Sequence, residues 1–117
     1  MSKERIVKAL KVLGLSNIDA QVYIFLAKQG PHKAGETAAE LESHEQKVRK
    51  SFRDLESTGI VKASIEHPLE FEAMPFEEVL NLLIEVKREQ AKTLQTSKDE
   101  FLSTWRSVTE EDDEEAS

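Results

Sequence analysis

The chain has 117 residues and no cysteine, and its 23 Asp and Glu outnumber its 16 Lys and Arg, which gives a formal net charge of −7. This length predicts one domain with a modest core, and the absence of cysteine excludes disulfides and thiolate metal sites and fits a reducing cytoplasm. The N-terminus lacks the apolar core of a signal peptide, and no segment approaches the ~18 unbroken apolar residues typical of a membrane-spanning helix. We therefore expect a cytoplasmic protein with no membrane partner.

The charges are unevenly distributed along the chain. Six carboxylates stand together at 110–115, and without them the chain has 17 acidic and 16 basic residues and a formal net charge of −1. Residues 63–86 hold six acidic residues and no Lys or Arg, whereas residues 45–53 hold four basic residues and one Glu. The body of the protein is therefore nearly neutral, with one strongly basic stretch and acidic stretches elsewhere.

Apolar residues recur at helical spacing in four segments of the first half of the chain, at about 3–13, 17–28, 34–42 and 46–57. Gly14 and Gly59 are suited to the left-handed conformation that ends a helix. Ser16 is expected to cap the second helix, with Asp19 as its partner in an arrangement like a capping box. These signals predict four short helices.

The fourth of these segments is amphipathic. Val48, Phe52 and Leu55 are spaced four and three residues apart and share one face of the predicted helix. The opposite side holds polar and basic residues, namely Gln46, Arg49, Lys50 and Arg53, with Lys47 beside them. Such a face either meets a negatively charged partner or is a solvated surface whose charges pair with acidic neighbours.

A β-hairpin is expected at 60–73, where apolar and polar residues alternate with a period of two on both sides of a turn at His67 and Pro68. From Pro75 to about residue 107 the pattern returns to helix, with no further Gly or Pro. Its apolar or tolerable positions follow an eleven-residue repeat, which favours a straight or slightly right-handed helix pair. The residues from 109 onward are expected to form a disordered acidic tail.

Helices followed by a β-hairpin and a further helix are the order of a winged helix-turn-helix domain, so the predicted fold is mainly α with a small β-hairpin (α+β). We expect this domain at 1–75, a long C-terminal helix at 76–108 and the acidic tail at 109–117. A helix of ~45 Å would overhang so small a domain, and its apolar stripe predicts a homodimer held by a coiled coil. The predicted interface residues are Val79, Leu83, Val86, Gln90, Leu94, Phe101 and Trp105.

In such a fold, the fourth helix enters the major groove of double-stranded DNA while the third lies over the phosphates. Lys and Arg on the exposed face would neutralise phosphates or donate to guanine, and Gln46 could read adenine. The helix-turn-helix order therefore favours DNA contact over a merely solvated basic face. A two-fold dimer would set two recognition helices about one DNA turn apart, ~34 Å, and would prefer a pseudo-palindromic site.

Three stretches of the sequence resemble a known family. LGLSNIDAQVYIFLAKQGP, VRKSFRDLESTGIV and EFEAMPFEEVLNLL are similar to segments of the TrmB-type archaeal winged-helix transcription regulators, and the resemblance covers Ala9 to Leu83. It implies sequence-specific DNA binding by a dimer and control of transcription. Longer members carry a C-terminal sugar-binding domain. We expect this chain to be a short form without that domain, with no sugar effector and no cofactor.

The sequence departs from the family pattern at the places where DNA would be touched. The family commonly has Gly-Ile-Pro-Arg-Ser where this chain has Glu42-Ser43-His44-Glu45-Gln46, so that Glu45 replaces a basic residue. Lys33 stands where a threonine is usual and could still meet a phosphate. The wing offers only His67 among acidic residues, and DNA affinity would therefore rest on the helix at 46–57 and on Lys33.

Motifs for catalysis or metal binding are absent from the sequence. The three histidines are far apart, and there is no Ser-His-Asp order, Gly-rich phosphate loop or paired metal-ligand spacing. We therefore expect neither an enzyme nor a metal site. The rival hypothesis to DNA binding is a winged-helix protein-interaction module, which would dock a basic or transcription-related partner through its acidic hairpin and tail.

Overall fold

The computed structural model describes the backbone of residues 2–116 and the side chains of residues 2–110. The chain divides into two compact units, with unit 1 extending to Leu83 and unit 2 beginning at Ile84. Helix α5 (Phe76–Thr96) contributes residues to both units.

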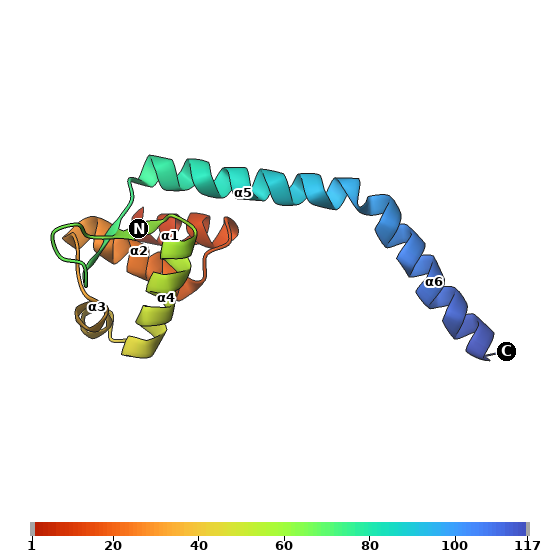
Figure 1. The fold of residues 1–117 in the computed structure, drawn as a ribbon, viewed down its shortest axis with the longest axis horizontal. Helices are drawn as coiled ribbons and strands as arrows, with labels where there is room; N and C mark the ends of the chain where they lie inside the picture. Colours follow the sequence, from red (N-terminus) through yellow and green to blue (C-terminus); the bar gives the residue numbers. More distant parts are fainter. Residues whose placement is uncertain (1, 117) are drawn as a thin grey trace. The chain divides into compact units, whose positions relative to one another are not determined.

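Unit 1 contains four helices, a two-stranded sheet and the first residues of α5 (Figure 1). Its elements are α1 (Ser2–Val12), α2 (Asn17–Gln29), α3 (Ala34–Glu40), α4 (Glu45–Ser57), β1 (Val61–Ala63) and β2 (Phe71–Ala73). This order confirms the predicted winged helix-turn-helix, mainly α with a small β-hairpin. Each of the four helices begins and ends within two residues of its expected bounds.

Local sequence signals set the boundaries of these helices. The Ser16 hydroxyl accepts a hydrogen bond from the Asp19 N–H (3.1 Å) and caps α2 as predicted. Beyond the end of α4, Gly59 has a φ of +83°, a conformation that a side chain would strain. The Ile60 N–H then donates to the Leu55 carbonyl (2.9 Å), which turns the chain out of α4 and into β1.

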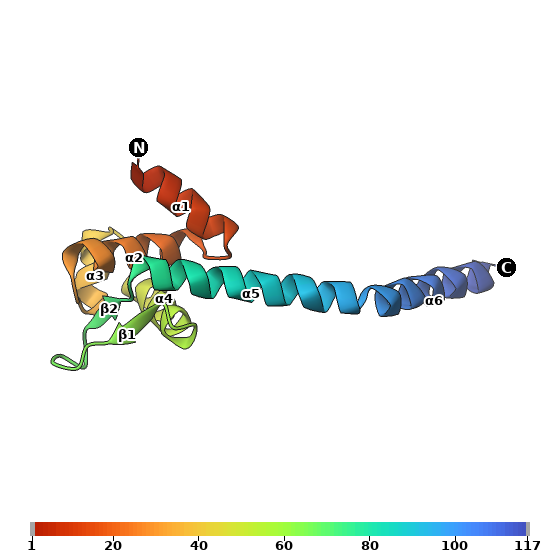
Figure 2. The ribbon, with the colours of Figure 1, turned by 90° about the horizontal axis from the view of Figure 1, so that it is seen from above.

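The hairpin is shorter than its sequence pattern predicted. β1 and β2 form an antiparallel hairpin (Figure 2). Val61 lies opposite Ala73 and Ala63 opposite Phe71, and the backbone of His32 forms one further bridge to Phe71. The intervening residues 64–70 form a loop, closed by the Ser64 N–H donating to the Glu70 carbonyl (2.8 Å). Alternation was expected to continue through Ile65 and Leu69, but these side chains are 89% and 75% exposed because the strands have already ended.

Two partly buried polar contacts join distant elements of the core of unit 1. The Tyr23 hydroxyl donates to the Met74 carbonyl (2.7 Å), and the Ser51 hydroxyl donates to the Asp19 carboxylate (2.7 Å). The Asp19 carboxylate is therefore engaged with α4, whereas a capping-box role was expected from the sequence. Around these contacts the apolar core draws on every element of the unit, from Leu10 in α1 to Leu83 in α5.

Val79 and Leu83 belong to this core. Their side chains are only 1% and 5% exposed, so the structure places them inside the monomer rather than on a face open to a second copy. They were expected in the dimer interface because one helical stripe runs through both units. A repeat in the sequence identifies the apolar face of a helix but does not say what covers it.

The helix expected to continue unbroken to about residue 107 is divided at Ser97. α5 ends at Thr96, and α6 (Lys98–Ala116) follows, with a change of direction visible in Figure 1. The Thr96 hydroxyl donates to the Thr93 carbonyl (2.9 Å), which also accepts from the Ser97 N–H (3.0 Å). Hydroxyl side chains that compete for helix carbonyls bend helices, and the Thr-x-x-Thr-Ser sequence supplies them here.

The C-terminal bound of α6 also differs from the sequence prediction. A disordered acidic tail was expected at 109–117, whereas the helix extends to Ala116 through a run without Gly or Pro. The side chains of residues 111–117 lie outside those that the structure describes.

Candidate nucleic-acid interface

Helix α4 presents two chemically different faces. Val48, Phe52 and Leu55 are buried in the core of unit 1, as their spacing predicted. The five residues of the expected polar face are all exposed, namely Gln46, Lys47, Arg49, Lys50 and Arg53. The apolar side therefore holds the helix to the domain and leaves the basic side open.

Contacts from two other elements hold α4 in place. The buried Ser51 hydroxyl is bonded to Asp19 in α2, and the ring of Phe52 lies 4.9 Å from that of Phe71 in β2, measured between centroids. Aromatic pairs at this separation add to the stabilisation that burial gives. The orientation of α4 is thus fixed from both the helical and the sheet side of the domain.

The turn between α3 and α4 is stabilised by backbone hydrogen bonds but contains one strained residue. The Ser43 N–H donates to the Ala38 carbonyl (2.9 Å), and Glu42 has a φ of +52°. Residues with a Cβ adopt this left-handed conformation at a cost of roughly 1–2 kcal/mol. In the family that the sequence resembles, glycine is common at this position, and glycine adopts this backbone conformation without strain.

Glu45 and Arg49 form an ion pair on the exposed side of α4. The Glu45 Oε2 atom accepts from Arg49 Nη2 (3.2 Å) and from Arg49 Nε (3.3 Å). Both side chains are more than half exposed, and exposed pairs of this spacing stabilise a helix by only about 0.3–0.5 kcal/mol. The spacing of four residues, with Glu preceding Arg, is a sequence signal for this pair.

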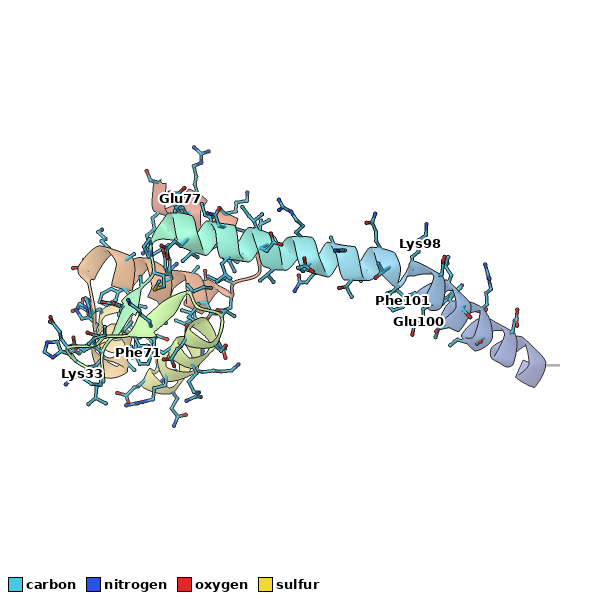
Figure 3. The ribbon with its side chains drawn as sticks, turned by 45° about the horizontal axis from the view of Figure 1, so that its top comes forward. Lys33, Phe71, Glu77, Lys98, Glu100 and Phe101 are labelled. Atoms are coloured by element: carbon cyan, nitrogen blue, oxygen red, sulfur yellow. The ribbon has the colours of Figure 1, made fainter. Side chains whose placement is uncertain are left out.

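Three of the expected DNA-binding residues line one surface hollow. It has a volume of about 410 Å³ and lies between α3, α4 and the hairpin, with Lys33, Arg49 and Arg53 at its polar edge and Phe52 and Phe71 among its apolar residues. Figure 3 labels Lys33 and Phe71 at this end of the unit. Gln46, Lys47 and Lys50 are exposed on α4 but do not line the hollow.

The wing differs from α4 in charge and in polarity. His67 is exposed in the loop, and Lys62 on β1 pairs with Glu72 on β2 (3.4 Å). The loop at 64–70 contains two Glu and no Lys or Arg, and its exposed apolar side chains, Ile65 and Leu69, were not expected. The cations of unit 1 that were expected to touch DNA are therefore on α4 and at Lys33, not on the wing.

Unit 2 carries a separate apolar surface. Of the expected interface residues, Val86, Gln90, Leu94, Phe101 and Trp105 are exposed, and the last two are 55% and 65% exposed. Phe101, labelled in Figure 3, shares one face of α6 with Leu102, Trp105 and Val108. Leu102 was missed because the repeat was counted from α5 without restarting at Ser97.

Tyr23 carries a buried hydroxyl in the core of unit 1. Burial raises the pKa of the Tyr23 hydroxyl to about 12, so it is a proton donor within the core. Within residues 2–110, no three His, Asp or Glu side chains are grouped as a metal site would require. Nor does any helix among the described residues combine the length and apolarity needed to cross a lipid bilayer.

The helical core, the exposed basic α4 and the β1–β2 wing define a winged helix-turn-helix domain. Residues 10–77 match the model of a family described as the sugar-specific transcriptional regulator TrmB, and this match covers more than half of the chain. The protein belongs to the TrmB family. This confirms the resemblance seen in the sequence and the expectation that the chain is not an enzyme.

One solved structure shows the same fold over nearly the whole chain. It is that of TrmBL2, described as an archaeal chromatin protein with a novel mode of DNA binding, and it matches with a TM-score of 0.75 at 23% sequence identity. The match covers 88% of this chain and 40% of TrmBL2, so the chain spans less than half the length of that protein. No curated protein sequence gives a significant match.

Proposed function

We propose that this protein is a DNA-binding transcription regulator whose helix α4 enters the major groove. The observation that supports this most directly is the exposed face of α4, where four cations and one amide project from a helix anchored by its opposite side. The chain belongs to a family of transcriptional regulators, and such a basic face needs a partner of opposite charge. Double-stranded DNA is that partner.

The chemistry of the individual side chains suggests which of them contact bases and which contact phosphates. Recognition helices contact base edges mainly through their first turns, where Gln46, Lys47 and Arg49 lie. An amide can donate to and accept from adenine, and a guanidinium can donate twice to guanine. Lys50, Arg53 and Lys33 are placed later on α4 or before α3, and we assign them to phosphates.

We further propose that the regulator acts as a homodimer through unit 2. Val86, Leu94, Phe101 and Trp105 leave a large apolar surface exposed on the described helices, and a second copy of the same surface is its simplest complement. A two-fold dimer would bind a pseudo-palindromic site with its recognition helices about 34 Å apart.

A salt titration of DNA binding tests the proposed role of α4. We expect log affinity to fall with log salt by about 0.9 for each phosphate neutralised. The double variant Lys50→Ala/Arg53→Ala should reduce both affinity and slope, whereas Lys3→Ala/Lys8→Ala removes the same charge from α1 and should change them far less. Absence of binding at low salt, or equal effects of the two variants, would contradict the proposal.

A second function is supported by the wing. Its loop exposes Ile65 and Leu69 beside Glu66 and Glu70, a combination suited to a partner protein with basic and apolar side chains. In this alternative the chain is an interaction module that docks a basic or transcription-related protein, with the acidic residues at 110–115 as a second contact. Retention of a stoichiometric partner from native extract after nuclease treatment, lost on Ile65→Ser/Leu69→Ser, would favour this alternative.

A further inference from the structure

Glu45 is held from two sides at the start of α4. One carboxylate oxygen, Oε2, accepts both hydrogen bonds from Arg49. The other, Oε1, lies against Gly35 in α3, so close that a Cβ built on this glycine would be 2.5 Å from it. The carboxylate thus occupies the space left by a missing side chain and holds the guanidinium by its Nε edge.

We propose that Glu45 is a positioning residue that presents Arg49 to guanine, and that glycine at position 35 is required for this arrangement. The inference rests on the proposed DNA binding and names the base that one residue of α4 selects. It also gives Glu45 a role: this carboxylate stands where the family has a basic residue, and it sets the direction of the neighbouring cation.

The number of N–H donors that Glu45 leaves free on Arg49 supports a contact with guanine. Arg has five N–H donors, and Glu45 takes one from Nε and one from Nη2. The two donors of Nη1 and the second donor of Nη2 are left, and they form the end of the fork. Two parallel donors at this end match the O6 and N7 acceptors of guanine in the major groove.

Holding the fork also reduces the choice of partners. An unrestrained Arg on an exposed helix can turn to any phosphate within reach and then carries no sequence information. An Arg held along one edge by a carboxylate of its own helix has fewer orientations and less charge to offer a phosphate. Pairing with Glu45 therefore lowers the affinity of Arg49 for phosphates in general and favours its contact with guanine.

Gly35 offers a way to move Glu45 without removing any charge. Gly35 is in helix α3 and has no positive φ, so its backbone accepts alanine. Among the described residues, and apart from its chain neighbours and the backbone of its own helix, a new Cβ would meet within 4 Å only the flexible end of the Glu45 side chain. Gly35→Ala should therefore leave the domain folded and displace the carboxylate from Arg49.

The test is the base preference of the full chain, measured by selection from a randomised DNA pool and then by competition between matched sites. We expect one guanine in each half-site to depend on Arg49, and preference for it to fall roughly tenfold in Arg49→Lys, which loses the bidentate contact. Glu45→Gln and Gly35→Ala only loosen an exposed ion pair, so they should lower the preference about twofold. Two matched variants should keep the preference: Glu56→Gln removes the same charge from the far end of α4, and Ala39→Ser makes a small change in α3.

A double variant separates positioning from a general effect on the fold. If Gly35 acts through Glu45, Gly35→Ala should have no further effect on the guanine preference in the Glu45→Ala background, whereas independent effects would multiply. Circular dichroism and thermal melts on each variant exclude loss of folding as the cause.

The outcomes distinguish this inference from the proposed function. If the natural chain binds DNA with a sequence preference that Glu45→Gln and Gly35→Ala leave unchanged, the positioning role is wrong and DNA binding stands. If the natural chain binds no DNA, both are wrong. An equal fall of preference in Glu56→Gln would show a charge effect and would also overturn the positioning role.

Discussion

Units 1 and 2 differ in the burial of their apolar side chains. In unit 1, apolar residues from every helix and from β1 are buried in one core. Among the described residues of unit 2, 84–110, no side chain is buried, and seven large apolar ones are exposed. The two units are adjacent in sequence and both largely helical, so helix formation alone does not account for the difference.

This contrast indicates two sources of stability. Unit 1 owes its stability to long-range contacts within one chain, which do not depend on protein concentration. Isolated helices are marginal in water unless their apolar face is packed. The order of unit 2 should therefore depend on a partner, and its stability on the concentration of that partner. Four changes test these two sources of stability, and the one with the greatest expected effect comes first.

Removing a core aromatic should affect unit 1 most. Phe52→Ala deletes a buried ring that contacts Phe71, and such truncations cost about 3–5 kcal/mol. We expect a large fall in the thermal midpoint, the same at low and high protein concentration. The exposed Glu56→Ala on the same helix is the control and should change the free energy of unfolding by less than about 0.5 kcal/mol.

High pH should weaken unit 1 through Tyr23. Its pKa is raised to about 12 in the folded chain, against about 10 when unfolded, so the unfolded chain loses the proton first. Stability should be full below about pH 10 and fall as the pH rises to about 12, by at most roughly 2–3 kcal/mol. Denaturant titrations of Tyr23→Phe should lack this component, and an identical pH profile in both proteins would contradict the assignment.

Truncating the apolar face of α6 should act on association and leave unit 1 intact. Trp105→Ala removes the most exposed of the described side chains on the proposed dimer face, and central aromatics of interfaces typically contribute about 2 kcal/mol or more. We expect the dimer dissociation constant to rise at least about tenfold in sedimentation equilibrium. Lys98→Ala on the same helix should leave it unchanged. A chain that is monomeric at all concentrations would refute the dimer.

Relieving the strained turn should stabilise unit 1 slightly. Glu42 has a φ of +52°, and Glu42→Gly should raise the free energy of unfolding by about 1 kcal/mol. Glycine in place of the exposed Ala39, inside α3, should have the opposite sign and cost roughly 0.5–1 kcal/mol. Denaturant titrations give the free energy of unfolding of both variants. A loss of stability in Glu42→Gly would show that the Glu42 side chain makes a stabilising contact.

What the sequence predicted well is what depends on short spacing. The helical period placed Val48, Phe52 and Leu55 together on the buried face of α4, and the Ser16 cap followed from local chemistry. The features that the sequence did not predict depend on contacts between residues far apart in the chain, or on side chains that compete with the backbone for hydrogen bonds. Ser51 reaches Asp19 across 32 residues of sequence. The period of α5 could not tell that Val79 meets the core while Leu94 does not. The division at Ser97 depends on hydroxyls competing for a carbonyl, which a Gly and Pro rule overlooks.

The bridge between His32 and Phe71 separates the wing into an anchored base and an exposed loop at 64–70. The hydrogen bonds that His32 and Phe71 exchange (3.2 and 2.9 Å) anchor the base of the hairpin to the segment before α3. The loop at 64–70 contributes only Ser64 as a buried side chain. Such a loop can open or change its residues without disturbing the domain. Substitutions that change the charge of the acidic tip should therefore leave the fold of the domain intact.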